Sequence, residues 1–175
     1  PMKVVSIQLV AFTLTSIVLF AMVLFSHAEQ PPSRERQAIA DLLRGRFQWK
    51  VSPPLVAPVE RPTDPCFSVK DPSVVFYQKR WHLFCTIRSQ NRSHQIEYLS
   101  FADWQEANAA PRHVLTMHNG YFCAPQVFYF TPHQKWYLIC QASDESWQPK
   151  YQPAFSTTTN IADPVSWEPL TPLGA

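Results

Sequence analysis

The chain has 175 residues, of which 46% are hydrophobic and 14% aromatic, with 17 prolines and only three glycines. Its 15 Lys and Arg against 13 Asp and Glu give a formal net charge of +2, which is too weak a balance to indicate a nucleic-acid partner. The length is enough for one modest domain.

Residues 1–28 have the pattern of a targeting segment. Lys3 precedes an apolar run over residues 4–25, and Ser26 and Ala28 supply small residues at a signal-peptidase site. The run is longer than the usual apolar region of about 7–15 residues, so an uncleaved membrane anchor through residues 4–25 is the alternative. Both interpretations predict a protein that is secreted or anchored at the cell surface.

Residues 29–64 are expected to form a leader and a proline-rich linker. Ser33 is placed to cap a short helix that ends at Arg44, before Gly45, although a flexible leader is the alternative. Four prolines between residues 47 and 64 favour an extended connection into the fold: Pro53, Pro54, Pro58 and Pro62.

Residues 65–175 contain two copies of one pattern, a strand, a polar turn and a second strand that ends in cysteine. The first copy covers residues 72–85 and the second residues 125–140. The opening prolines are 53 residues apart and the closing cysteines 55. A repeat of this length with hairpins inside it is typical of propeller blades, so we predict an all-β fold.

The predicted strands follow the repeat in chain order. In the first copy they cover residues 67–69 with 72–77, 81–87 and 95–101, followed by a helical turn capped by Asp103; in the second they cover 124–130, 136–141 and 154–158. Consecutive apolar residues in these strands predict burial on both faces. Residues 169–175 are expected to be a connection between blades.

Two blades are too few to close a propeller, which needs at least about four. The pattern therefore predicts that residues 65–175 are the N-terminal two blades of a longer propeller, and that the chain is a fragment of a longer protein.

Four cysteines in an exported chain are candidates for two disulfides, with three possible connectivities. Cys85 and Cys140 are expected on equivalent strands, and Cys66 and Cys123 precede the first strand of each copy. The alternative is that they are small buried apolar residues.

Asp71 is the residue of the repeat that suggests chemistry. It follows Lys70 and precedes Pro72 at the start of an innermost strand, whose end faces the usual propeller site. A carboxylate beside an ammonium group is held ionised, as a general base requires. An ordinary Asp-Pro-Ser turn is the alternative. The second copy has Ala124 at the same place, which favours a role in a site over a role in the scaffold.

Five segments in register resemble glycoside hydrolase family 62, the α-L-arabinofuranosidases that act on arabinoxylan. They are residues 69–75, 101–107, 120–130, 135–138 and 155–167. The resemblance implies a five-bladed propeller and an inverting mechanism with two carboxylates. It implies that Asp71 is the general base and that Lys70, Trp147 and Pro153 contact substrate. It also implies that the catalytic acid and an auxiliary aspartate follow Ala175.

The remaining charged residues are expected to be surface groups, namely Glu97, Glu106, Asp144 and Glu145. His94, His113 and His118 are expected in loops, and Asn91 begins a glycosylation sequon in an exposed loop. No cofactor or metal site is indicated, and a calcium ion in the channel of a complete propeller is left open. The alternatives to the arabinofuranosidase are a non-catalytic carbohydrate-binding module and a xylosidase or arabinanase of the related family 43.

Overall fold

The computed structural model describes residues 33–46 and 51–174 of a chain that divides into two compact units, Pro1–Val51 and Ser52–Ala175. The described part of the first unit contains α2 (Arg34–Leu43). Ser33 caps this helix, because its Oγ accepts the Arg36 N–H at 3.3 Å, and Gly45 follows its end with a φ of 68°. The predicted helix is therefore confirmed.

The predicted signal peptide or anchor over residues 1–28 lies outside the described residues. Among the helices that are described, none is long and apolar enough to cross a bilayer.

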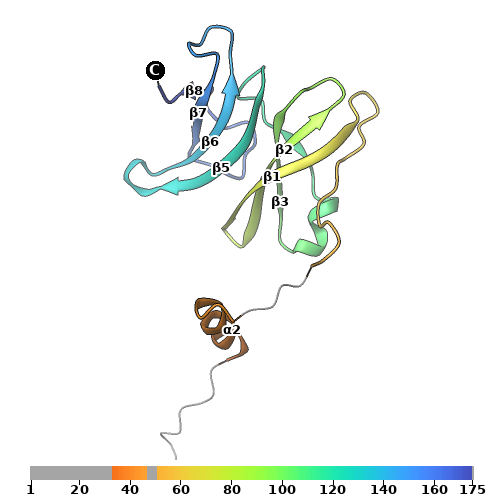
Figure 1. The fold of residues 1–175 in the computed structure, drawn as a ribbon, viewed down its shortest axis with the longest axis vertical. Helices are drawn as coiled ribbons and strands as arrows, with labels where there is room; N and C mark the ends of the chain where they lie inside the picture. The colour runs from red at the N-terminus through yellow and green to blue at the C-terminus, as the bar shows by residue number, and fades with distance from the viewer. Residues whose placement is uncertain (1–32, 47–50, 175) are drawn as a thin grey trace, which may run out of the picture. The chain divides into compact units, whose positions relative to one another are not determined.

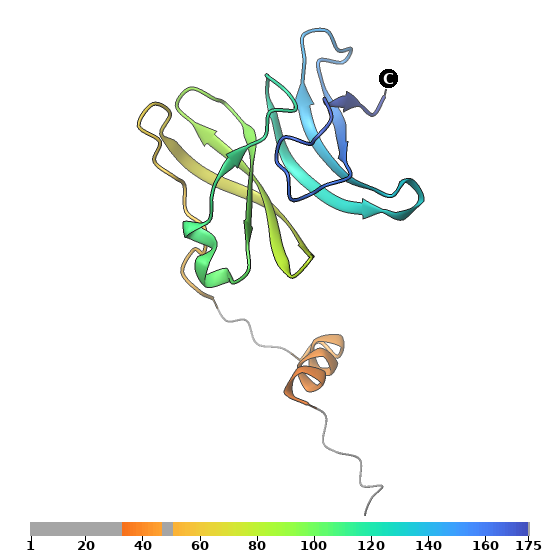
Figure 2. The same cartoon turned by 180° about the vertical axis from the view of Figure 1, so that it is seen from behind.

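The second unit consists of two four-stranded antiparallel sheets (Figures 1 and 2). The first sheet has the order β1 (Cys66–Tyr77), β2 (Arg80–Ser89), β3 (Gln95–Phe101) and β4 (His113–Val114). The second has the order β5 (Phe122–Phe130), β6 (Lys135–Ser143), β7 (Tyr151–Thr158) and β8 (Thr171–Pro172). Each copy of the sequence repeat forms the first hairpin of one sheet, so the all-β class is confirmed.

The two hairpin turns account for the unequal spacing of prolines and cysteines. Gln78 and Lys79 connect β1 to β2 with φ of 48° and 60°, the left-handed pair that suits a tight hairpin. The second turn is longer, because the 3-10 helix η2 (Thr131–His133) precedes Gln134. The predicted helical turn after β3 is η1 (Trp104–Ala109), capped by Asp103.

Each sheet ends in a two-residue edge strand that the sequence analysis did not predict. Residues 169–175 were expected to be a connection only, but Thr171 pairs with Phe155 and Pro172 with Ala154. A strand of two residues is too short to show a hydrophobic period, so β4 and β8 could not be predicted from local pattern. Each of them forms because it pairs with the neighbouring strand. Pro172 is tolerated because it lies on an edge strand.

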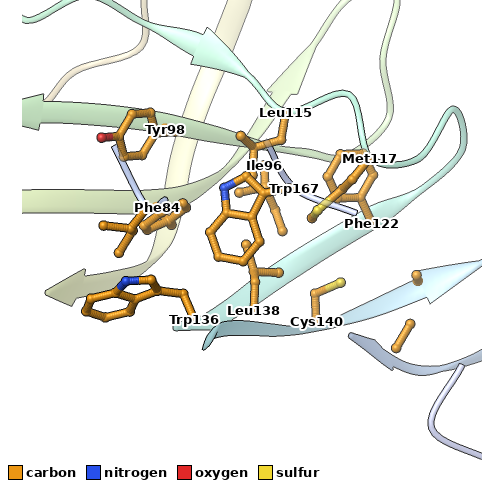
Figure 3. Packing of buried hydrophobic residues seen from close by; sticks show 13 residues of the cluster. Phe84, Ile96, Tyr98, Leu115, Met117, Phe122, Trp136, Leu138, Cys140 and Trp167 are labelled. Atoms are coloured by element: carbon orange, nitrogen blue, oxygen red, sulfur yellow. The ribbon is translucent and has the colours of Figure 1, made fainter. Parts of the chain in front are cut away.

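The main hydrophobic core lies between the two sheets (Figure 3). Phe84, Ile96 and Tyr98 of the first sheet meet Phe122 and Leu138 of the second. A smaller cluster covers the other face of the first sheet, where Leu83, Cys85 and Leu99 pack under η1 and Val56. Side chains of β2 thus alternate between two apolar clusters, and residues 82–87 are all buried.

The prediction of burial on both faces is wrong for β1 and β5. Phe76 is 56% exposed and Phe128 41% exposed. They lie on the face of each strand away from the main core, since the neighbouring Val75 and Val127 pack against that core, whereas β2 is covered on both faces.

Candidate functional site

Asp71 lies on a β-bulge in β1, and the same bulge recurs in β5. The register shifts between Lys70 and Ser73 and again between Cys123 and Gln126. Asp71 has a φ of 52° and Ala124 a φ of 55°. A proline follows each of them, and since proline donates no N–H, the ladder is interrupted at that point. Asp71 is exposed, and it lies midway along β1 instead of at the start of a strand as predicted, because β1 begins at Cys66 and pairs with β2 on both sides of the bulge.

Two hydrogen bonds fix the bulges relative to one another. The Thr86 Oγ1 accepts the Ala124 N–H at 2.8 Å, and the Ser73 Oγ accepts the Val127 N–H at 2.9 Å. Both cross from one sheet to the other, where β5 packs against β1 and β2. Thr86 was not predicted from the sequence as a residue of this site. The available signal was a hydroxyl inside a strand predicted to be buried, because such a group needs a partner.

His94 and Tyr121 lie within electrostatic reach of Asp71. Burial lowers the pKa of His94, and the nearby Lys70 and Arg88 charges lower it further, while the Asp71 carboxylate acts in the opposite direction. The hydrogen bond with Cys123, together with burial, raises the pKa of Tyr121 to about 12, and Asp71 contributes in the same direction. The two rings are 5.0 Å apart at their centroids. The Asp71 charge therefore acts on two aromatic side chains, one from the β2–β3 loop and one from the segment before β5.

The other predicted substrate contacts lie in different surroundings. Lys70 is exposed and borders an apolar hollow of about 280 Å³ with Trp104. Pro153 borders another hollow, of about 380 Å³, together with Ala124 and Tyr151. Pro153 therefore lies near the counterpart of Asp71 in the second sheet, and Lys70 lies on the outer side of the first.

Trp147 packs inward from the β6–β7 loop. Its ring stacks on His118 with centroids 5.7 Å apart and an angle of 18° between planes, and it contacts the main core. Both contacts are typical of an aromatic residue that packs a loop onto the core. A role for Trp147 in substrate binding stays a prediction.

Glu97 corrects one prediction. It was expected to be a solvated surface charge, but it is only 1% exposed. Its carboxylate pairs with Arg61 and, at 3.1 Å, with Arg112. A charged side chain is buried in a protein interior only when partners of opposite charge neutralise it. For Glu97 one of these partners, Arg61, comes from the proline-rich segment. Glu106 and Glu145 are exposed, as predicted, whereas Asp144 is half-buried.

All four cysteines are buried, free thiols. Cys85 and Cys140 occupy equivalent strands, β2 and β6, as predicted. Burial raises the pKa of each of these two thiols to about 12, so they are protonated near neutral pH. In the structure all four cysteines are therefore small buried residues, which was the alternative to the predicted disulfides.

The remaining predictions concern loops and metals. Asn91 is exposed, and its side-chain amide donates to the Thr63 carbonyl at 2.8 Å. His94 and His118 lie in loops, but His113 begins β4. Within residues 33–46 and 51–174, no group of three His, Cys, Asp or Glu side chains is placed to hold a metal ion.

Comparisons with known proteins place this geometry in context. No family model matches the chain. It is 36% identical over 125 residues to α-L-arabinofuranosidase C of Cellvibrio japonicus, a match that covers 70% of this chain and 18% of that protein. The catalytic domain of the Coprinopsis cinerea GH62 α-L-arabinofuranosidase superposes with a TM-score of 0.63 at 33% identity, over 72% of this chain and 38% of that one.

The chain is similar to part of a GH62 α-L-arabinofuranosidase. The arabinofuranosidase PaAbf62A of Podospora anserina, solved with cellotriose, gives a TM-score of 0.59 at 29% identity over 69% of this chain and 36% of that one. The GH62-like region therefore spans well under half the length of these relatives. Its two sheets have the propeller-like arrangement of the GH62 structures, and glycosidase chemistry is the activity of that family.

Proposed function

We propose that the GH62-like region supplies the base-bearing part of an inverting α-L-arabinofuranosidase that removes arabinose side chains from arabinoxylan. In this proposal the two sheets are the first two blades of a five-bladed propeller. Asp71 is the general base, and Lys70, Trp147 and Pro153 contact the sugar.

The observation that carries the proposal is the repeated bulge. Both sheets have it, but only the first carries a carboxylate there, at Asp71, while the second has Ala124. Bulges are over-represented beside active sites, where they re-aim a side chain, so a carboxylate that only one of the two bulges carries is a candidate for chemistry. The similar proteins are arabinofuranosidases, and two related structures were solved with xylotriose and with cellotriose.

The mechanism assigns to Asp71 the activation of water. An ionised carboxylate accepts a proton from a water molecule as that water attacks the anomeric carbon from the face opposite the leaving group. A second carboxylic acid protonates the leaving oxygen, at about 6.5–9.5 Å from the base. Glu97 does not suit that role, because Arg61 and Arg112 already neutralise it in the interior. We propose that the acid is supplied by a later blade.

The test is arabinose release from arabinoxylan by the complete protein. Asp71→Asn keeps the shape of the side chain and removes the base, so release should fall by about 10²–10⁴-fold. Asp103→Asn is the matched control, since Asp103 is an exposed carboxylate that caps η1. Unchanged release by Asp71→Asn, with an unchanged circular dichroism spectrum, would remove Asp71 from the mechanism.

We also propose that the protein is exported, because its substrate is a cell-wall polysaccharide and residues 1–28 have the pattern of a signal peptide or anchor. Fractionation of cells that express the complete protein checks this, and retention in the cytoplasm would contradict it.

A non-catalytic carbohydrate-binding role is the second candidate. It is favoured by one observation: Glu97, the buried carboxylate of the first sheet, is ion-paired with Arg61 and Arg112 and does not suit the role of the acid. It predicts that arabinoxylan is bound and not hydrolysed, which a pull-down and a reducing-sugar assay on one preparation distinguish.

A further inference from the structure

A hollow of about 440 Å³ lies at the end of the first sheet where β3 begins. Its walls come from the segment before β1, from the β2–β3 loop with the start of β3, and from β4 with the segment that follows it. That last segment crosses from the first sheet to the second (Figure 2). The volume is within the range of about 300–1,000 Å³ that is usual for small-molecule sites. Lys70, Trp147 and Pro153 are not among the residues that line it.

Backbone hydrogen bonds hold the walls of the hollow in place. The Asn91 N–H of the β2–β3 loop donates to the Asp64 Oδ1 at 2.9 Å, which fixes this loop to the segment before β1. The Leu115 N–H donates to the Ile96 carbonyl at 2.9 Å, which fixes the segment after β4 to β3. The hollow is therefore preformed, which lowers the entropic cost of binding.

Arg92 presents part of its guanidinium group to the hollow. Its Nε pairs with the Asp64 Oδ2 at 3.0 Å, and its Nη1 donates to the Gln95 Oε1, also at 3.0 Å. Within residues 33–46 and 51–174 the Arg92 Nη2 has no partner. Because the Gln95 Oε1 accepts from Arg92, the Gln95 Nε2 remains a donor. Two donors at this wall are thus available to a ligand.

The ion pairs around the hollow leave one positive charge in excess. Arg61 lines the hollow and pairs with Glu97, which Arg112 shares at 3.1 Å. Three guanidinium groups, those of Arg61, Arg92 and Arg112, therefore face two carboxylates, Asp64 and Glu97. The Arg61 Nη1 is buried and has no hydrogen-bond partner among the described residues.

The other titratable groups nearby do not add a negative charge to the walls. Among the described residues that line the hollow, none carries a carboxylate. His118 lines it, and its Nε2 lies 2.9 Å from the Ser143 carbonyl. The Asp144 carboxylate is within electrostatic reach of His118, but it lines the neighbouring hollow of about 730 Å³ and accepts the Ser146 N–H at 2.8 Å. The walls of the 440 Å³ hollow thus favour an anion.

The remaining walls suit an organic anion with hydroxyl groups. Thr116 and Asn119 are exposed and offer a hydroxyl and an amide, which both donate and accept. Val114 and Leu115 add apolar surface. Inorganic phosphate would use the charge but not the apolar surface. One excess charge matches a monoanion, and the planar guanidinium group matches a carboxylate.

We propose that this hollow binds a sugar acid, with Arg92 meeting its carboxylate and with Thr116 and Asn119 meeting its hydroxyl groups. The choice of a sugar rests on the proposed function, whereas the preference for an anion rests on the hollow itself. The site is separate from the attack on arabinose at Asp71.

The test is binding of methyl β-D-glucuronide to the 175-residue chain, measured by isothermal titration calorimetry. Methyl β-D-glucoside has the same ring without the charge, and inorganic phosphate has the charge without the ring. The glucuronide should bind at least about ten-fold more tightly than either, because only the glucuronide provides both a charge-assisted hydrogen bond to Arg92 and contacts for the other walls.

Two variants locate the site. Arg92→Gln removes the guanidinium group and should weaken glucuronide binding about ten-fold. Its matched control is Arg80→Gln, which removes an exposed arginine at the other end of β2. Asn119→Asp places a like charge in the hollow at an exposed position and should weaken binding by at least about ten-fold. Its control is Gln105→Glu on η1, which follows the opposite end of β3. Both controls should bind as the wild type does.

Equal affinity for glucuronide and glucoside, or no binding of either, would overturn the inference. Phosphate that binds as tightly as the glucuronide would overturn the assignment to a sugar acid. Wild-type affinity in Asn119→Asp would also overturn the inference, and this variant removes no side-chain hydrogen bond of the described residues. The proposed function fails on a different result, arabinose release that persists in Asp71→Asn of the complete protein, so the two failures are distinguishable.

Discussion

Asp71 and Ala124 share a left-handed backbone conformation, with φ of 52° and 55°, at the same bulge of two sheets. Each precedes a proline, and both bulges lie at the boundary between the sheets. Since the backbone is common to both, the bulge belongs to the scaffold. The carboxylate is present in one copy only, and the fold does not require it.

Ala124→Gly should stabilise the protein. A residue with a Cβ costs about 1–2 kcal/mol in the left-handed region, and glycine removes most of that cost while losing some entropy on folding. We expect a net gain of about 0.5–1 kcal/mol in the free energy of unfolding by urea. Ala154→Gly is the control, because Ala154 is buried in β7 without positive φ, and should lose stability. A loss in both variants would contradict the strain at Ala124.

Thr86→Val should destabilise the contact between the sheets. Valine has the shape of threonine but leaves the Ala124 N–H without its 2.8 Å acceptor. The bond is part-buried, so we expect a loss toward the lower end of the about 1–3 kcal/mol that an unsatisfied donor costs, seen as a lower urea midpoint. Thr86→Ser keeps the hydroxyl and should retain most of the stability. Equal losses in the two variants would show that packing of the methyl group, and not the hydrogen bond, is what matters.

The sequence predicts the two hairpins well because the repeat carries their information locally. The predicted strand over residues 95–101 has the bounds of β3, and Gln78 and Lys79 form the expected turn. Ser33 and Asp103 cap their helices as predicted, since a side-chain oxygen before a helix satisfies an orphan N–H whatever the rest of the fold does.

The failures occur where distant segments decide the outcome. Glu97 is buried because Arg61, 36 residues earlier, reaches its carboxylate. The strand β8 exists because β7 offers an edge. In the site, Asp71 was predicted from the repeat and Pro153 from the resemblance, but Thr86 and the contact of His94 with Tyr121 required the arrangement of the two sheets. Contacts between residues that are far apart in the chain produce no periodic pattern in the sequence, so they could not be predicted from it.

Glu97→Ala should cost about 3–5 kcal/mol, because it leaves the Arg61 and Arg112 guanidinium groups without their common carboxylate. The Arg112 side chain is 7% exposed, so its charge is poorly solvated by water. Thermal unfolding measures the loss, and Glu106→Ala, an exposed carboxylate on η1, should change stability by less than about 0.5 kcal/mol. A small effect at Glu97 would show that the cluster opens to solvent.

Cys85 and Cys140 should resist alkylation in the folded protein. Burial raises the pKa of both thiols to about 12, so little thiolate is present at pH 8. Iodoacetamide followed by mass spectrometry should label them only after unfolding. The unfolded thiols ionise near pH 9, so stability should fall as the pH rises from there toward 12. Rapid labelling of the native protein at pH 8 would contradict the burial.

The stability of the fold should also fall as the pH is lowered below about 6.5. His82 is 1% exposed; its Nδ1 lies 2.8 Å from the Tyr98 hydroxyl and its Nε2 3.3 Å from the Tyr77 carbonyl. Burial lowers the pKa of His82 below the usual 6.5. The unfolded chain then binds a proton that the folded chain does not, so the stability present above pH 6.5 is lost as the pH falls.

Two observations isolate the histidine contribution. Burial also lowers the pKa of His94, whereas hydrogen bonds lower the pKa of Asp64 and of Asp144 below 3.8, so these carboxylates act only in stronger acid. Urea unfolding across this range should give a shallower pH dependence for His82→Gln than for the wild type, whatever its stability at pH 8. An unchanged slope in His82→Gln would mean that His82 is already protonated in the folded state or that its proton affinity does not change on folding.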